Sequence, residues 1–257
     1  MIRSAAAAGV LALTFLWAPG GAYANQATPD FIRAAIADPA RPADQVARDG
    51  NRKPAAVIAF SGLKPGDRVG DFMSGNAYFT RIFSRVVGDT GHVYAFVPDE
   101  ELKNCDSSET AGTLALAHDA AYSNVTVLKG PVNSFHAPEA LDLVWTSLNF
   151  HDLYDSFMGP ADVPAVTKAL FASLKPGGVF LVIDHAAEAG SQIRDTGTLH
   201  RIDPEVIIRE AQAAGFKLEA QSDALRNPND THKLRVFDAA IRGRTDQVVL
   251  KFRKPVS

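Results

Sequence analysis

Two hydrophobic periods alternate along most of the chain. From residue 54 onward, short apolar runs typical of buried strands are separated by segments whose apolar residues recur every three or four positions, as on one face of a helix. The clearest helical segment is 78–87, with an apolar face made by Phe79, Ile82, Phe83, Val86 and Val87. Strands that alternate with helices predict an α/β fold built on a doubly wound, mostly parallel sheet. Such sheets bind ligands beyond the carboxyl ends of their strands.

The same pattern predicts individual elements. We expect strands at 67–72, 93–97, 125–128, 141–148 and 179–184, and helices at 78–87, 114–122 and 163–174. A later helix is capped by Asp203, has Pro204 as its first residue and ends near Gly215. Two final strands, 233–239 and 247–252, flank a turn-like segment and predict an antiparallel hairpin at the C-terminus.

The N-terminal residues do not show this alternation of strand and helix patterns. Arg3 precedes an uncharged apolar run at 5–18, and Ala22-Tyr23-Ala24 has the small residues of a cleavage site. We therefore expect residues 1–24 to be a signal peptide and the mature protein to be periplasmic or secreted. The run is shorter than the roughly 20 residues that span a bilayer, so no stable membrane anchor is expected. Residues 25–53 form an N-terminal arm, and 54–257 form the main domain.

Composition and charge narrow the class of partner. The 257 residues are 46% hydrophobic and 21% charged, which is typical of a globular protein. The net charge of −3 argues against binding driven by phosphate neutralisation, so nucleic acid is not an expected partner. Cys105 is the only cysteine and cannot form an internal disulfide. Nothing in the sequence indicates an oligomeric state.

The strongest local motif is 69–78, a strand that ends in Asp71 and is followed by a turn of small residues that opens a helix. This segment resembles the first motif of the class I S-adenosylmethionine-dependent methyltransferases, Asp/Glu-x-Gly-x-Gly-x-Gly. The segment 141–145, followed by Asn149-Phe150-His151-Asp152-Leu153, is similar to that family's fourth strand and loop. The segment 174–184 closely matches its "LKPGG" turn and fifth strand.

The resemblance implies a Rossmann-like sheet of seven strands that ends in a C-terminal antiparallel hairpin. It also implies that S-adenosylmethionine is the cofactor and that the methyl group goes to a small-molecule acceptor, which the sequence does not identify. By position in the motifs, the resemblance assigns a set of cofactor-binding residues: Asp71, Ser74, Gly75, Ala77, Tyr78, Glu100 and Asn149.

The chain departs from the family's pattern at two places. Met73 and Ala77 stand where the first and third glycines are usual, so the glycine motif is degenerate. The acid that ends the family's second strand falls on Val97 here, and Asp99 and Glu100 follow it. These departures, together with an expected location away from the cytosolic source of the cofactor, favour an alternative: a non-catalytic exported binding protein that retains the fold. An enzyme that uses another adenosine-type ligand is a third reading.

Two histidines are the candidate catalytic residues. His151 and His185 follow neighbouring strands of the expected sheet, which places both side chains within reach of one pocket. An imidazole suits proton removal near neutral pH, and His151 is the preferred general base because of its loop. A divalent metal held by these histidines with Asn149, Asp152 and Asp184 is an alternative, but the spacing is not diagnostic and no metal is assigned.

Each of two polar segments allows two interpretations, one structural and one functional. The charged run 48–53 is either a solvated surface or part of an arm that closes over the cofactor. The long stretch 186–202 contains Arg194, Asp195, His200 and Arg201 and is more typical of a substrate lid than of a linker.

Overall fold

A central sheet organises the protein. The computed structural model describes residues 28–159 and 161–256, and within them seven strands form one sheet in the order β3-β2-β1-β4-β5-β7-β6. The first five strands pair in parallel, while β7 runs antiparallel to both β5 and β6. The strands are β1 (Arg68–Phe72), β2 (His92–Pro98), β3 (Val125–Gly130), β4 (Leu141–Ser147), β5 (Leu174–His185), β6 (Lys217–Ser222) and β7 (Gln247–Arg253). The expected doubly wound α/β fold is confirmed.

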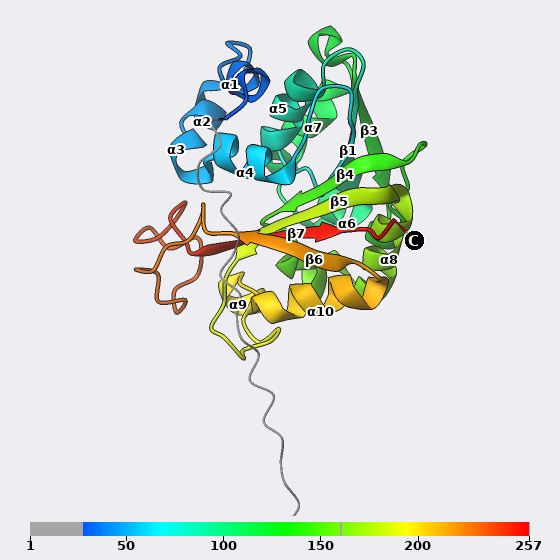
Figure 1. The fold of residues 1–257 in the computed structure, drawn as a ribbon. Helices are drawn as coiled ribbons and strands as arrows, with labels where there is room; N and C mark the ends of the chain where they lie inside the picture. The colour runs from blue at the N-terminus through cyan, green and yellow to red at the C-terminus, as the bar shows by residue number, and fades with distance from the viewer. Residues whose placement is uncertain (1–27, 160, 257) are drawn as a thin grey trace, which may run out of the picture.

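Helices cover both faces of the sheet (Figure 1). On one face, α1 (Asp30–Ile36), α4 (Pro54–Ser61), α5 (Tyr78–Val87) and α7 (Ala111–Leu116) pack over an apolar cluster centred on the fully buried Trp145. On the other face, α8 (Val163–Ser173) and α10 (Pro204–Ala214) cover a second cluster that contains Phe180 and Phe252. The remaining helices are short: α2 (Ala43–Val46), α3 (Asp49–Arg52), α6 (Asp99–Asn104) and α9 (Thr196–Leu199).

Local sequence signals explain where several helices begin and end. The predicted helix 78–87 is α5, and its apolar face packs against Trp145. The Asp162 side chain accepts a hydrogen bond from the Ala165 amide and caps α8, and Asp203 caps α10 through the Glu205 amide. Gly215 ends α10 in the left-handed conformation that glycine adopts without a steric penalty.

The predicted C-terminal hairpin has the wrong first strand. Residues 233–239 form no strand, and β7 pairs with β6 instead. The sequence of β6, Lys-Leu-Glu-Ala-Gln-Ser, is mostly polar because β6 is the half-exposed edge of the sheet. Its polarity hid it from a search for apolar runs, while the antiparallel C-terminal pair itself is confirmed.

The predicted helix 114–122 is also too long. The helix α7 ends at Leu116, and residues 120–122 form a separate 3-10 turn. The Asp119 side chain accepts a hydrogen bond from the Ala121 amide and caps this turn. Asp side chains compete with helical hydrogen bonds in this way, which explains the interruption.

The N-terminal arm is part of the packed structure. Ile32 and Ala35 on α1 are buried against the cluster that contains α5. Arg41 forms a bidentate pair with Asp49, with nitrogen–oxygen distances of 2.7 and 2.8 Å. The arm therefore carries core residues as well as the charge that its sequence displays.

The predicted signal peptide, 1–24, lies outside the described residues. Among the residues that the structure does describe, no helix combines the length and the apolar character required to span a membrane.

Candidate active site

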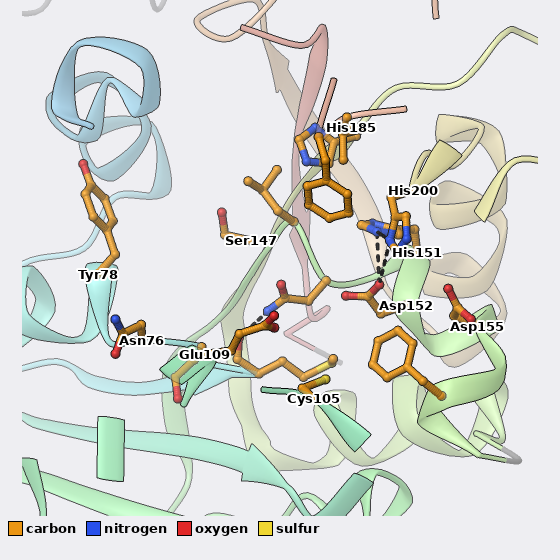
Figure 2. Close-up of a pocket in the computed structure, with 18 of the residues that line it drawn as sticks. Asn76, Tyr78, Cys105, Glu109, Ser147, His151, Asp152, Asp155, His185 and His200 are labelled. Carbon is orange, nitrogen blue, oxygen red and sulfur yellow. Dashed lines mark hydrogen bonds and ion pairs between the residues drawn. The ribbon is translucent and has the colours of Figure 1, made fainter. Parts of the chain in front are cut away.

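A cavity of about 730 Å³ opens at the carboxyl ends of the parallel strands. Asp71 on β1, Ser147 on β4 and His185 on β5 all line it. Tyr78 and Asn76 lie at one end of the close-up in Figure 2, and His151, Asp152 and His200 lie at the other, with Ser147 between them. The volume is in the range of small-molecule sites, and its position is the one expected for a doubly wound sheet.

The turn after β1 has a left-handed backbone at three positions, although only one of them is a glycine. Met73, Gly75 and Ala77 have φ angles of +58°, +53° and +61°, in the left-handed region. For a residue with a Cβ this conformation costs about 1–2 kcal/mol. Surrounding hydrogen bonds hold it: Asn149 Nδ2 donates to the Met73 carbonyl oxygen, and Gln45 Nε2 donates to the Asn76 carbonyl oxygen at 2.8 Å.

The three positions differ in what they present to the cavity. Met73 and Gly75 line it, whereas Ala77, the N-cap residue of α5, is fully buried in the core and is not a lining residue. A Cβ added to Gly75 would meet the Glu109 carbonyl oxygen at 3.9 Å as its nearest described neighbour. The substituted third glycine therefore leaves the cavity open, while the retained second glycine borders it.

Asp71 is a buried carboxylate at the base of this turn. It is 3% exposed, and Thr80 Oγ1 donates a hydrogen bond to its Oδ2 at 2.6 Å. Burial raises the pKa of Asp71 to about 7, although the Thr80 hydrogen bond and the Arg52 guanidinium partly oppose this. The cavity thus contains an acid that is close to its titration point at neutral pH.

The arm contributes two cations to the same end of the cavity. Arg48 and Arg52 both line it, and the Arg52 guanidinium lies 4.4 Å from the centre of the Tyr78 ring and 4.8 Å from that of Phe79. Arg52 also donates to Ser147 Oγ at 3.2 Å. Burial lowers the pKa of Arg52 to about 10, which leaves it charged at neutral pH. Of the two readings of the run 48–53, the structure supports the arm that closes over the site.

The acids after β2 lie elsewhere. Glu100 is not among the lining residues, and its Oε2 accepts a hydrogen bond from the Val132 amide at 2.9 Å. Asp106 and Glu109, which follow α6, line the cavity instead. The structure therefore does not bring Glu100 to the predicted cofactor site, because its carboxylate is held by the Val132 amide in the 3-10 turn after β3.

His151 lies in a buried network of carboxylates. Its Nδ1 is 2.8 Å from Asp184 Oδ1, and its Nε2 is 3.1 Å from Asp152 Oδ1. Burial lowers the pKa of His151, but the carboxylates of Asp184 and Asp152 raise it more, to about 10. The ring is therefore an imidazolium at neutral pH, which is unsuited to remove a proton.

His185 has the opposite character. Its ring centre lies 6.0 Å from that of His151, and both imidazoles line the same cavity, as predicted from the order of the strands. Among the described residues, Thr245 Oγ1 is the hydrogen-bond partner of its Nδ1, at 2.7 Å. Burial, His151 and Arg201 lower the pKa of His185 well below its usual value, so the ring is neutral. These opposite pKa shifts favour His185 over His151 as a candidate base.

The remaining predicted residues divide between the cavity and the core. Ser74, Gly75, Tyr78 and Asn149 line the cavity, while Trp145 is fully buried in the core. Within the stretch 186–202, His200 reaches the cavity, but Arg201 is fully buried and serves the fold.

The sequence reading missed other lining residues that come from distant loops: Asp106, Glu109, Asp155, Arg235 and Phe237. No apolar period or motif marks these positions.

Comparisons with known proteins agree with the fold. No protein-family model matches the chain. The ubiquinone/menaquinone biosynthesis C-methyltransferase UbiE of Vibrio cholerae is 26% identical over 182 residues, which cover 69% of this chain and 65% of that protein. A solved S-adenosylmethionine-dependent methyltransferase from Aquifex aeolicus superposes with a TM-score of 0.54 at 17% identity, over 79% of this chain and 89% of that one. The chain is related to class I S-adenosylmethionine-dependent methyltransferases and has their fold.

This fold also carries other chemistry. The [4+2]-cyclase SpnF has a TM-score of 0.57 at 18% identity, over 83% of each chain. The fold alone therefore does not specify methyl transfer, and the reaction has to be argued from the site. In addition, the alignment spans just under two thirds of the length of the Vibrio cholerae relatives.

Proposed function

We propose that the protein transfers the methyl group of S-adenosylmethionine to a small-molecule acceptor. One observation carries the proposal: the left-handed turn at 73, 75 and 77, with Asp71 buried at its base, borders a cavity that also holds a neutral histidine. The relationship to the UbiE methyltransferases supports it.

The residues present fit this cofactor. Asp71 and Arg52 put opposite charges at one end of the cavity, which suits the amino and carboxylate groups of the methionyl part. Gly75 leaves room beside the turn for close approach to the backbone. Glu109 and Asp106 supply the acids that can accept hydrogen bonds from ribose hydroxyls, in place of Glu100.

The bound cofactor would supply an already activated methyl group. The chain's own task is then to align the acceptor atom with that group and to exclude water. His185 would accept the proton of a hydroxyl or amine acceptor, since it is neutral and lines the cavity. His151, held between two carboxylates, would instead fix the geometry of the wall on which His185 lies.

Replacing His185 with glutamine should separate rate from binding. We expect kcat to fall roughly 100-fold, while cofactor affinity stays within about threefold, since the lost group acts on the acceptor's proton. Single-turnover assays with a labelled methyl donor measure the first quantity and calorimetry measures the second. His136→Gln, at an exposed position that does not line the cavity, is the matched control. Equal loss of rate in both variants would contradict the role of His185.

The turn offers a paired test of the degenerate motif. Gly75→Ala should weaken S-adenosylmethionine binding about tenfold or more. The new Cβ would border the cavity, and residue 75 has a φ of +53°, which disfavours any side chain. Ala77→Gly should leave affinity within about threefold, because the Cβ it removes is in the core. Calorimetric titration of both variants measures the contrast, and a larger effect at 77 than at 75 would contradict the proposed cofactor position.

A non-catalytic binding protein is the second candidate. The specific observation in its favour is that the usual ribose-binding acid is replaced by Val97, and that Glu100, three residues later, accepts a hydrogen bond from the Val132 amide and is not among the described lining residues of the cavity. Titration of the chain from residue 25 onward with S-adenosylmethionine and S-adenosylhomocysteine, with adenosine alone as a control, tests both candidates. Binding of the first two with turnover on an acceptor library supports the enzyme. Binding without turnover on any acceptor favours the binding protein, and no binding contradicts the proposal.

We also propose that the protein acts outside the cytoplasm. The charged start, the apolar run and Ala22-Tyr23-Ala24 support this location. N-terminal sequencing of the protein from a periplasmic fraction should give a chain that begins at Asn25. An intact Met1 in the cytosolic fraction would contradict it.

A further inference from the structure

Three side chains converge at the histidine end of the cavity. His151 and Asp152 belong to the 3-10 turn after β4, His151–Tyr154, and His200 immediately follows α9. His151 Nε2 lies 3.1 Å from Asp152 Oδ1 and 3.4 Å from His200 Nδ1, and His200 Nδ1 lies 3.7 Å from Asp152 Oδ1. Two elements that are about 50 residues apart in sequence thus bring three possible ligand atoms to one point (Figure 2).

The size of this triangle fits a metal ion. A tetrahedral ion with bonds of about 2.0–2.1 Å to nitrogen and oxygen separates its ligand atoms by roughly 3.3–3.4 Å. The three measured separations bracket that value. Two imidazoles and one carboxylate, with a fourth position open to a cavity, are a ligand set found in catalytic metal sites.

The surroundings of His151 resemble those of a metal ligand. Its Nδ1 and its backbone amide both contact the carboxylate of Asp184, each at 2.8 Å, and Asp184 is fully buried. A carboxylate that receives Nδ1–H fixes the ring orientation and directs the Nε2 lone pair away from itself. Here that direction is toward Asp152 and His200. His200 also adopts a left-handed backbone with φ of +54°, which turns its ring into the cluster.

One neighbour has to move when an ion binds. Arg235 Nη2 lies 3.1 Å from His200 Nε2, which must carry the ring proton when Nδ1 binds a metal. Arg235 is exposed, so its guanidinium can turn toward solvent. His151 Nε2 would release its proton at the same time. The carboxylates of Asp152 and Asp184 would balance the two positive charges of the ion.

We propose that His151, Asp152 and His200 bind one divalent first-row transition-metal ion, with zinc favoured by the ligand set and the triangle. The open position would face the cavity and would bind an oxygen of a small molecule there. This site does not depend on methyl transfer, since its ligands are separate from Asp71 and the turn at 73–77.

The test uses untagged protein stripped with a chelator. Zn²⁺ retained after dialysis against a competing chelator should be one ion per chain, measured by elemental analysis. Co²⁺ alone should give visible absorption bands typical of a tetrahedral site. His200→Ala and Asp152→Asn should each weaken Zn²⁺ affinity roughly 100-fold. His118→Ala and His136→Ala, at exposed positions outside the cluster, should not change it.

Each outcome decides the proposal. Circular dichroism and thermal melts show whether a variant is folded, and His200→Ala, on the cavity surface, provides the measurement if Asp152→Asn does not fold. Wild-type protein that retains no Zn²⁺, or folded His200→Ala that retains as much as wild type, overturns the site. Loss of Zn²⁺ in the exposed control variants overturns it as well, since binding would then be a surface effect. S-adenosylmethionine titration of the same His200→Ala protein keeps failure of the metal site distinct from failure of the methyltransferase proposal.

Discussion

Asp71→Asn should weaken S-adenosylmethionine binding by roughly 10- to 100-fold at pH 8, the scale of a charge-assisted hydrogen bond lost in a buried site. The variant should fold, because asparagine has nearly the same shape and its side-chain oxygen can still accept the hydrogen bond from Thr80. Calorimetric titration of both proteins gives the ratio of dissociation constants. Equal affinities would mean that Asp71 only supports the turn.

The size of this effect should depend on pH. Burial raises the pKa of Asp71 to about 7 in the unliganded protein, so below pH 7 the group is mostly protonated and resembles asparagine. A cationic ligand group favours the carboxylate, so binding at low pH has to displace a proton. At pH 6 this costs about 1.4 kcal/mol, since one unit separates the pH from the pKa. The difference between wild type and Asp71→Asn should therefore be large at pH 8 and small at pH 6.

Asp71→Asn should weaken cofactor binding but stabilise the unliganded protein at high pH. A carboxyl group whose pKa is higher in the folded state stabilises the fold below its unfolded pKa, and that contribution is lost as pH rises through about 7. Asp71→Asn should thus raise the melting temperature of the unliganded protein at pH 8 and raise it less at pH 5, where the folded-state carboxyl group is still protonated. Asp142→Asn is a useful control. Asp142 lies at the amino end of β4, does not line the cavity, and forms an ion pair with the exposed Lys175. A melting temperature that falls at pH 8 in Asp71→Asn would contradict the buried-charge argument.

Arg201→Met should destabilise the protein by about 3–5 kcal/mol, the usual effect of leaving one partner of a buried ion pair alone. Arg201 Nη2 lies 2.9 Å from Asp230 Oδ2, and both side chains are almost completely buried. The same guanidinium donates to the carbonyl oxygens of Ala186 and Leu234, each at 3.0 Å. These contacts attach the segment between β6 and β7 to the end of β5, beside the cavity.

Thermal unfolding should report this as a fall in melting temperature of roughly 10 °C. Arg33→Met is a control, since Arg33 pairs with Asp30 and the two side chains are 57% and 89% exposed, and an exposed pair contributes less than about 1 kcal/mol. If both variants melt alike, the buried pair is not what secures the segment. The Arg201 variant should also bind acceptors more weakly, because Val236 and Phe237 line the cavity from that segment.

The two candidate histidines, His151 and His185, show what could be predicted from the sequence and what could not. Parallel strands that are neighbours in the sheet bring their carboxyl ends together, so the proximity of His151 and His185 could be predicted. Their protonation could not. The protonation of His151 depends on its burial and on the carboxylate of Asp184, the residue before His185 on β5. The protonation of His185 depends on its own burial and on His151 and Arg201. The same reason explains why Arg235 was not predicted and why His200, named only as part of the stretch 186–202, could not be placed beside His151: each lies in a loop whose path no local pattern records.

The sequence by itself determined the layered α/β fold, because the period of apolar residues specifies which face of each strand or helix is buried. It also located the turn after β1 and the cap of α10, since these depend on residues only a few positions apart. Only the tertiary structure decided that β7 pairs with the polar edge strand β6, that Glu100 turns away from the cavity, and that the arm directs Arg52 into it. Those outcomes depend on the packing of segments that are distant in the chain, and a side chain's burial and charged neighbours exist only once that packing has formed.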